Sequence, residues 1–369
     1  MGILPISTHN ERGFTLIELM VGVVLAVIVV AAAFTILTTT SKAIRANDQV
    51  VDTQQNTRVA MDLITGDIKV AGFGMTAQGI TNQVGGCTNG AGSFAMIPSD
   101  NTTTGTGADT GADKISLVIP TTDTLWKLQS GTGDSGFKTI TLSSGGGQSL
   151  VDAGMNTAVA ASAKISINGA ITATVASRAG DVLTLTDTVT APAQFPAGTP
   201  IYLLQCIRYQ IGTPGACSSN GPCLMRGTVA ADGTTSLSPI VDGIEDIQFA
   251  YACDGCLGGG VPDRSVDDQG ATPSGTFDQA DFLTNQTWST APLTPDKIRL
   301  VQVSVVGRQI ADDQGFGEDV RGKAVSSSAV QVSDHYHADD TGYNSTTYSQ
   351  YRRRVLTKTV GTRNVGNES

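Results

Sequence analysis

The feature that most constrains this chain is an apolar run near its N-terminus, inside the stretch RGFTLIELMVGVVLAVIVVAAAFTIL. From Leu19 to Leu37 the run contains no charged side chain, and a helix of about 18–20 apolar residues can span a bilayer. Glu18 stands directly before it. An acid near the centre of such a helix costs roughly 2.5–3.5 kcal/mol, and less near its end. The run predicts a membrane segment, and we expect Glu18 to have a function that offsets its cost.

Two common kinds of apolar N-terminus explain this stretch less well. A cleaved secretory signal has a basic start, an apolar core of about 7–15 residues and a small-residue cleavage site, for which Ala31–Ala33 is a candidate. Here the apolar run is too long, and the preceding MGILPISTHNER is barely basic. A plain membrane anchor accounts for the length of the run, but not for Glu18 or for the Gly13–Phe14 junction.

The segment RGFTLIELMV closely resembles the processing site of type IV pilins and type II secretion pseudopilins. In that family a membrane peptidase cuts after the glycine, and the new terminal residue is N-methylated. The resemblance implies cleavage after Gly13 and methylation of Phe14, and it makes Glu18 the acidic fifth residue of the mature chain. Residues 1–13 are then a leader peptide.

This processing implies a role for Glu18 in assembly. Cleavage leaves an amine on Phe14, and the (i, i+4) spacing places it on the same helix face as Glu18. When subunits stack, the carboxylate of one can also reach the amine of its neighbour, in a low dielectric that strengthens the pair. We therefore interpret Glu18 as the residue that sets the register of subunits. The alternative is a carboxylate that reaches back to the lipid headgroups.

One long helix is expected over residues 14–71, which contain no proline. Its first part, 14–37, is apolar on all sides, as a membrane span or filament core requires. Its second part is amphipathic. The apolar residues that recur there at spacings of three and four, on the face expected to pack against a globular body, are Ala60, Leu63, Ile64, Ile68 and Ala71. Gly72 and Gly74 are stop signals, and Gly66 is a weak point.

The segment RVAMDLITGDIKVAGFG narrows the family, because it resembles the minor pilins called PilW. The residues that carry this pattern are Arg58, Leu63, Asp67, Ile68, Ala71, Gly72, Phe73 and Gly74. The later segments CLMRG, IVDGIEDIQFAYAC and YRRRVLTKTVGTRN also resemble PilW segments, in the same order. Pseudopilin J of type II secretion is similar in the helix and is the alternative.

The chain beyond the helix is expected to be rich in β-strands. It has many Thr and Ser, the whole chain contains 43 glycines, and its β-rich runs are bounded by Gly, Pro, Asp and Asn. The predicted runs are 111–120, 163–177, 181–190, 200–211, 244–253 and 297–308. We predict an α+β, type IV pilin-like fold, in which the helix packs on an antiparallel body over 72–369. Residues 125–200 do not align with PilW, and Leu257–Pro292 is expected to be a long variable loop.

Six cysteines behind an export-type N-terminus predict an oxidising compartment and disulfides. They are Cys87, Cys206, Cys217, Cys223, Cys253 and Cys256. Cys217 with Cys223, and Cys253 with Cys256, are candidates for short loops, although Cys206 can take a place in one of them. The CDGC motif lacks the helix start and βαβ context of a thioredoxin-type site. A zinc site on the last four cysteines is a further alternative.

Other polar motifs are interpreted as structural. His335 and His337 share one face if their segment is extended; with the nearby aspartates they can bind a metal, but a solvated loop is the preferred interpretation. The Asp-rich runs DNTTTGTGADTGAD and PDRSVDDQG lack the ligand order of an EF-hand. The glycines of Ser144–Ser149 are interpreted as a turn between strands. The sequence contains no pattern of a nucleophilic or phosphate-binding site in the required context, so no enzyme is predicted.

The formal net charge of −10 argues against nucleic acid as the primary partner. One basic cluster stands near the C-terminus and consists of Arg352, Arg353, Arg354, Lys358 and Arg363. We expect these side chains to pair with acids of the sheet or of a neighbouring subunit. A contact with DNA is the alternative.

The resemblance implies a minor pilin that takes part in type IV pilus assembly, in a priming or tip complex. It would be made as a single-pass prepilin in the bacterial inner membrane, with its body in the periplasm. The implied partners are other minor and major pilins, the prepilin peptidase, the membrane and the pilus assembly platform. No catalytic residue, cofactor or metal is expected. The alternatives are a secretion pseudopilin and a membrane-anchored adhesin or binding module.

Overall fold

The computed structural model describes residues 13–75, 84–89, 92–99, 109, 111–133, 136–155, 163–189, 194–213, 215–218, 221–256, 261–268, 277–284, 286–312, 328–340 and 342–365. The predicted leader, apart from Gly13, lies outside these residues. The chain divides into two compact units, residues 1–50 and 51–369, and each is described by itself.

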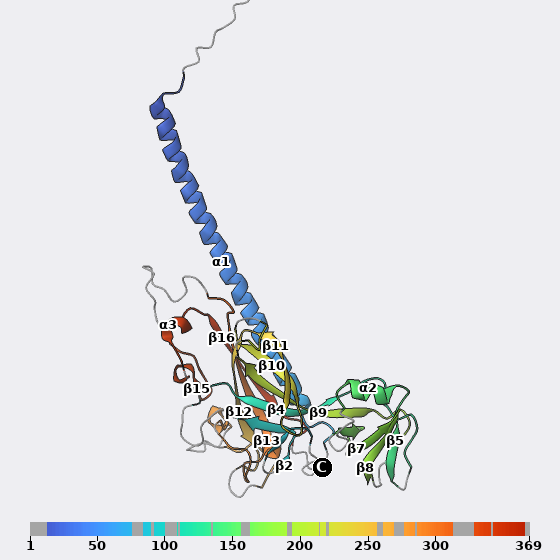
Figure 1. Ribbon diagram of the computed structural model, residues 1–369. Coiled ribbons are helices and arrows are strands. Elements are labelled where there is room, and N and C mark those ends of the chain that lie inside the picture. The colour runs from blue at the N-terminus through green and yellow to red at the C-terminus, as the bar shows by residue number, and fades with distance from the viewer. Residues whose placement is uncertain are drawn as a thin grey trace, which may run out of the picture. The chain divides into compact units, whose positions relative to one another are not determined.

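Helix α1 (Leu16–Val70) is the longest element of the chain (Figure 1). The helix predicted over 14–71 is thus confirmed, and it continues through Gly66. The chain leaves the helix through Gly72 and Gly74, whose φ angles are 79° and 81°. Glycine adopts this left-handed conformation at little cost, so the two predicted stop signals act as C-terminal caps.

In the first unit every described residue from Gly13 to Arg45 is exposed. The exposed residues include the apolar run itself, with Val24 and Leu25 each 57% exposed. A helix that is apolar on all sides is normally surrounded by lipid or by other helices. Within the first unit, the described residues therefore leave this apolar surface uncovered.

In the second unit α1 is amphipathic, as predicted. Ala60, Ile64, Ile68 and the following Ala71 are all 0% exposed. Leu63, which was predicted to face inward with them, is 40% exposed, and Met61 is buried instead. That part of the prediction is wrong because Leu63 and Met61 lie on opposite sides of Ala60 around the helix, and the buried stripe extends toward Met61.

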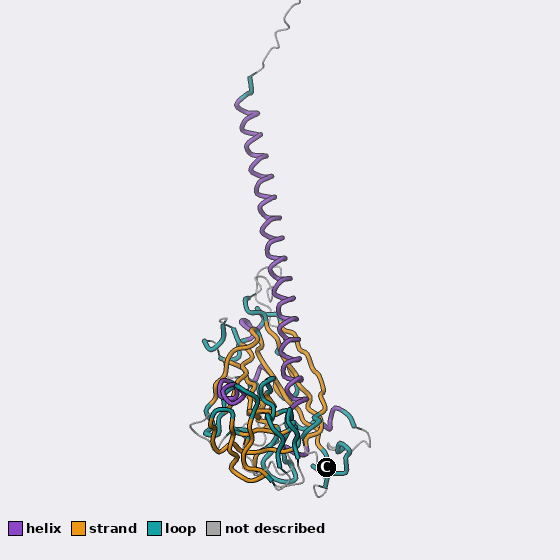
Figure 2. The backbone as a smooth tube through the Cα atoms, turned by 90° about the vertical axis from the view of Figure 1, so that its right-hand side faces the viewer, coloured by secondary structure: helices purple, strands orange, loops and turns teal. Residues whose placement is uncertain are grey.

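The second unit contains two main antiparallel sheets, and strands and loops run throughout it (Figure 2). The nine-stranded sheet has the order β11-β10-β9-β6-β7-β8-β5, with β4 paired to β9 and β3 to β4. Its strands are β3 (Met96–Ser99), β4 (Lys114–Thr121), β5 (Phe137–Thr141), β6 (Lys164–Ile167), β7 (Ile171–Ala179), β8 (Val182–Val189), β9 (Ile201–Gly212), β10 (Cys223–Val229) and β11 (Thr235–Asp242). The predicted α+β arrangement is confirmed.

The three-stranded sheet has the order β12-β13-β16. Its strands are β12 (Ile244–Cys253), β13 (Ile298–Arg308) and β16 (Arg353–Gly361). The main core joins α1 to both sheets, since Ile64 and Ile68 lie in one buried cluster with Leu117 of β4, Phe249 of β12 and Val303 of β13. This shared core explains why residues 51–70 of the helix belong to the second unit.

The remaining elements are short. They are β1 (Thr88–Asn89), β2 (Gly92–Ser93), β14 (Gln331–Val332), β15 (His335–Tyr336), α3 (Ser345–Tyr348), and the 3-10 helices η3 (Gln279–Asp281), η4 (Pro295–Lys297) and η5 (His337–Asp339). Within the described part of Leu257–Pro292, η3 is the only helix or named strand. The loop predicted there is consistent with this.

Residues 125–200, which do not align with PilW, form a lobe with a core of their own (Figure 1). Trp126, Leu150 and Leu185 are among its buried residues. The lobe continues the large sheet, because β6 pairs with both β7 and β9. A separate apolar core is what allows such a segment to be added to a body without disturbing the first core.

The structure corrects the prediction of a turn at Ser144–Ser149. Helix α2 (Gly146–Asp152) begins inside this segment. The carboxylate of Asp181, at the start of the β8 hairpin, accepts hydrogen bonds from the backbone N–H groups of Gly145 (3.0 Å) and Gly147 (2.9 Å). Because Asp181 satisfies these N–H groups from a distant part of the chain, the helix start has no local capping signal.

Candidate functional site

The predicted processing site lies just ahead of α1. Phe14 is 86% exposed, and a side-chain atom built on Gly13 would meet nothing within 4 Å. Among the described residues, both sides of the Gly13–Phe14 peptide bond are thus exposed. Both residues lie before the first residue of the helix, and cleavage after Gly13 stays a prediction.

Glu18 takes part in a capping box at the start of α1. Its Oε2 accepts hydrogen bonds from the backbone N–H and the hydroxyl of Thr15, both at 3.0 Å, and the N–H of Glu18 donates to Thr15 Oγ1 at 3.3 Å. Such reciprocal bonds satisfy N–H groups that lack partners at a helix start. The sequence reasoning missed Thr15, although Thr-x-x-Glu before an apolar run is the known signal for this cap. All three bonds are compatible with cleavage after Gly13, because they involve only Thr15 and Glu18.

A polar triad fixes the second part of α1 to the large sheet. The hydroxyl of Tyr209 donates to Asp67 Oδ2 at 2.5 Å, and Arg226 Nε lies 3.0 Å from both oxygens. Tyr209 is fully buried. Burial raises the pKa of the Tyr209 hydroxyl, and the adjacent Asp67 carboxylate raises it further, so this hydroxyl remains a donor at neutral pH. The triad connects Asp67 of the PilW-like helix pattern with Arg226 of the PilW-like CLMRG segment.

A second ion pair holds the C-terminal strand. Arg353 Nε donates to Glu245 Oε2 at 2.5 Å and its Nη2 donates to Oε1 at 3.0 Å, in a bidentate pair whose arginine side chain is 6% exposed. Arg308 adds a contact to the same carboxylate at 3.3 Å. Lys358 Nζ lies 3.6 Å from Asp62 of α1. The predicted pairing of the basic cluster with acids of the sheet is confirmed at Arg353, whereas Lys358 pairs with an acid of the helix instead.

The two histidines are buried, so the solvated loop predicted for DHYHADD is wrong. His335 and His337 are each 2% exposed, and Asp246 of β12 is 1% exposed. Asp246 Oδ2 lies 2.9 Å from His335 Nδ1 and 3.1 Å from His337 Nε2. Asp246 and His335 are 89 positions apart in the chain, so no local pattern could show that the loop folds onto β12.

This cluster is strongly polarised. Burial alone would raise the pKa of Asp246, but the hydrogen bonds from His335 and His337 lower it to about 2. Burial alone would likewise lower the pKa of His335, but its bonds to Asp246 and Asp340 raise it to about 10. At neutral pH, with no other ligand present, His335 is therefore an imidazolium held between two carboxylates.

All six cysteines are paired. Cys217 joins Cys223 and Cys253 joins Cys256, the two short-loop pairs considered from the sequence, and Cys87 joins Cys206 over a separation of 119 residues. The four sulfurs of the alternative zinc site are used in two of these bonds. Chain entropy predicts that the longest of the three loops stabilises the fold most.

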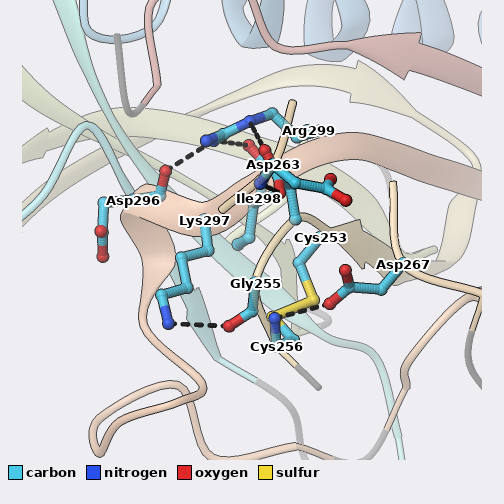
Figure 3. The surroundings of a disulfide bond; sticks show 10 residues. Cys253, Gly255, Cys256, Asp263, Asp267, Asp296, Lys297, Ile298 and Arg299 are labelled. Atoms are coloured by element: carbon cyan, nitrogen blue, oxygen red, sulfur yellow. Dashed lines mark hydrogen bonds and ion pairs between the residues drawn. A yellow bond between two sulfur atoms is a disulfide. The ribbon is translucent and has the colours of Figure 1, made fainter. Parts of the chain in front are cut away.

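The Cys253–Cys256 disulfide ends β12 and is surrounded by hydrogen bonds to the following loop (Figure 3). Asp267 Oδ2 accepts the N–H of Cys256 at 2.6 Å, and Lys297 Nζ donates to the carbonyl of Gly255 at 2.8 Å (Figure 3). The motif thus follows a strand, and Asp267 of the Asp-rich run PDRSVDDQG binds backbone at the turn. This arrangement braces a loop, and the described residues of the motif lie at the end of a strand rather than at the helix start of a thiol–disulfide oxidoreductase.

Comparison with known protein families gives two matches. Residues 208–364 match the model of type IV pilus-assembly protein W, and residues 8–34 match the prokaryotic N-terminal methylation motif. The first range contains Glu245 and Asp246 of β12 and Arg353 of β16. The second range contains Gly13, Phe14 and Glu18. The lobe at 125–200 lies outside both ranges. Comparisons with curated proteins and with solved structures found no significant match.

Proposed function

We propose that this chain is a minor pilin of type IV pilus assembly, because residues 208–364 match pilus-assembly protein W and residues 8–34 match the prokaryotic N-terminal methylation motif. It is made as a prepilin, cut after Gly13 and N-methylated on Phe14. The single observation that carries the proposal is the methylation motif at the head of one continuous helix whose far end lies in the core of the PilW-like body.

The apolar part of α1 serves first as an anchor and then as filament core. It is the one helix among the described residues that is long and apolar enough to cross a membrane. The same exposed surface suits packing against the equivalent helices of other pilins. No catalytic role is assigned to any residue, because the sites described above hold backbone and side chains together.

Glu18 sets the stagger between subunits. Its capping bonds to Thr15 use Oε2, and they hold the carboxylate at the helix start, one turn from the amine that cleavage creates on Phe14. Within a low-dielectric bundle of helices an unpaired carboxylate is costly. A subunit is therefore most stable at the stagger where its Glu18 carboxylate meets the Phe14 amine of a neighbouring subunit. The capping box thus keeps Glu18 in position before its assembly partner arrives.

The body is placed in the periplasm, where disulfides form and persist. The proposed partners are other minor and major pilins, the prepilin peptidase and the assembly platform in the inner membrane. By family analogy the protein acts in a priming or tip complex, present in few copies.

Mass spectrometry of the mature chain tests the processing step. We expect a first residue of Phe14 that carries one added methyl group. A mature chain that begins at Met1 or at Phe34 would contradict the prepilin assignment.

The Glu18→Ala variant tests the register. We expect the variant to be made, cleaved and folded, but lost from purified pili by immunoblot. The matched control is Asp52→Ala, which removes an exposed acid from the same helix and should leave incorporation unchanged. Normal incorporation of the Glu18→Ala variant would contradict the proposed role of Glu18 in setting the register of subunits. A deletion strain with normal pili but defective secretion would favour a pseudopilin, and immunogold label spread over the envelope would favour an anchored adhesin.

A further inference from the structure

We propose that Asp246, His335 and His337 form a binding site for a zinc-class divalent cation. One potential ligand atom from each of these buried residues lies within 4.8 Å of the other two. His335 Nδ1 and His337 Nε2 both point at one oxygen of Asp246, at 2.9 and 3.1 Å. Two ligand atoms that each lie about 2.0–2.2 Å from a tetrahedral zinc ion are separated from one another by only slightly more than these two N–O distances. Small shifts of the three side chains would admit the ion.

The strongest support for the proposal comes from the contacts made by the atoms of these residues that point away from the site. The other ring nitrogen of each histidine is held by an oxygen, since His335 Nε2 lies 2.8 Å from Asp340 Oδ1 and His337 Nδ1 lies 3.2 Å from the hydroxyl of Tyr348. Metal-binding histidines almost always have such a partner, which fixes the tautomer and the ring orientation.

The carboxylate is oriented in the same way. Asp246 Oδ1 accepts a hydrogen bond from Gln248 Nε2 at 2.9 Å, which leaves Oδ2 toward the two imidazoles. All three candidate ligands thus have one atom directed to a common point and another atom held from outside. Outer contacts of this kind preorganise a metal site, because they fix the ring orientation and the tautomer of each histidine ligand.

The donor set selects the type of metal. Two imidazoles and one carboxylate suit zinc and its first-row neighbours, whereas calcium takes six to eight oxygens and magnesium an octahedron of oxygens. Three protein ligands leave a fourth zinc position for water. The ion takes the place of the proton that His335 Nδ1 shares with Asp246. From the sequence alone we expected no metal, and the buried geometry replaces that expectation.

The ion would fasten the C-terminal segment to the core sheet. Asp246 belongs to β12, whereas His335 and His337 belong to β15 and η5. A ligand that binds only the folded state stabilises it by mass action. The proposed site is therefore a cross-link between β12 and the segment that precedes β16, and it is independent of the proposed role in pili.

The composition of the chain limits the other side chains that could bind zinc in a test of this site. The chain has three histidines, of which one is His9 in the predicted leader, so the histidines that remain in a His9→Gln chain are the two proposed ligands. Among the described residues there is no free cysteine. Imidazole or thiolate binding elsewhere in the oxidised, metal-stripped protein is thereby removed from the experiment.

The first experiment titrates this full-length chain in detergent with zinc and records imidazole ¹⁵N spectra, with cobalt(II) absorption as a second probe. We expect one ion per chain, bound through Nδ1 of His335 and Nε2 of His337, and a zinc-dependent rise in melting temperature. A folded protein whose two imidazoles do not respond to zinc would overturn the proposal, and this measurement needs no substitution at the proposed ligands.

Variants then locate the site. His337→Asn should abolish stoichiometric binding, and Asp340→Asn should weaken it about 10- to 100-fold by freeing the ring of His335. Asp339→Asn is the matched control, because Asp339 is an exposed acid of the same segment and should bind zinc as the parent does. Binding that is unchanged in a folded His337→Asn protein would also overturn the proposal.

Discussion

The two parts of helix α1 share one secondary structure but differ in how their apolar surface is covered. In the first unit Val24 and Leu25 are more than half exposed, whereas in the second unit Ile64 and Ile68 are 0% exposed. The described residues of the first unit do not cover this surface, which suits burial in lipid or against other helices. The second part is covered by the sheets of its own body. A substitution in the first part should therefore alter assembly, and one in the second part should alter stability.

The acids of the helix follow the same division. Glu18 bonds to Thr15 within its own helix turn, and its proposed partner comes from processing and from a neighbouring subunit. Asp67 instead bonds to Tyr209 and Arg226, which are more than 140 positions away in the same chain. An acid in the assembly segment is thus available to a partner, while an acid in the body segment is already used.

The largest expected effect on stability comes from Ile64→Ala. Removing a fully buried Ile side chain typically costs about 2–5 kcal/mol, since a cavity remains. We expect a correspondingly lower melting temperature of the body in detergent. Leu25→Ala, the same kind of truncation at an exposed position, should leave that transition unchanged. Equal losses in the two variants would break the comparison between the two parts of α1.

Asp67→Ala comes next. It leaves the buried hydroxyl of Tyr209 and the guanidinium of Arg226 without their acceptor, which typically costs about 1–3 kcal/mol. Chemical denaturation measures this loss, with Asp52→Ala as the exposed-acid control. In a double-mutant cycle, Tyr209→Phe should remove part of the Asp67 effect, because the two side chains act together. Strictly additive losses would contradict a coupled triad.

Local signals predicted much of this fold. The absence of proline, the apolar periodicity and the two terminal glycines located α1, and alternating β-rich runs located β12 and β13. The run predicted over 163–177 is in fact two strands, β6 and β7, joined at Asn168–Gly169 with φ angles of 58° and 72°, and this Asn-Gly hairpin signal, although local, was overlooked. Each of these features depends on residues close together in the chain.

The sequence did not predict features that depend on distant contacts. Helix α2 begins where the carboxylate of Asp181 caps Gly145 and Gly147, and His335 is buried because Asp246 lies beneath it. Periodicity cannot detect such partners. The inward orientation of Met61 in place of Leu63 likewise depends on which side of the helix the sheets cover. The Thr15 cap is different, because its signal was local and was overlooked.

Thr15→Ala should have a smaller effect, confined to the first unit. It removes the hydroxyl that accepts a hydrogen bond from the N–H of Glu18. Losing such a cap raises the population of the open first turn by roughly threefold to tenfold. Hydrogen exchange of the Glu18 amide in micelles would report this change. Thr15→Ser, which keeps the hydroxyl, should restore protection. A shift in the melting of the body would show that the two units are more closely coupled than the comparison implies.

The smallest expected effect lies in the body segment itself, at the ion pair of Asp62 and Lys358. Their side chains are 65% and 44% exposed, and exposed pairs contribute about 0.2–1 kcal/mol, less at high salt. Asp62→Asn should therefore change the free energy of unfolding far less than Asp67→Ala, and 1 M salt should erase the difference from the parent. A large, salt-independent loss in Asp62→Asn would mean that position along α1, rather than burial, decides how much an acid contributes.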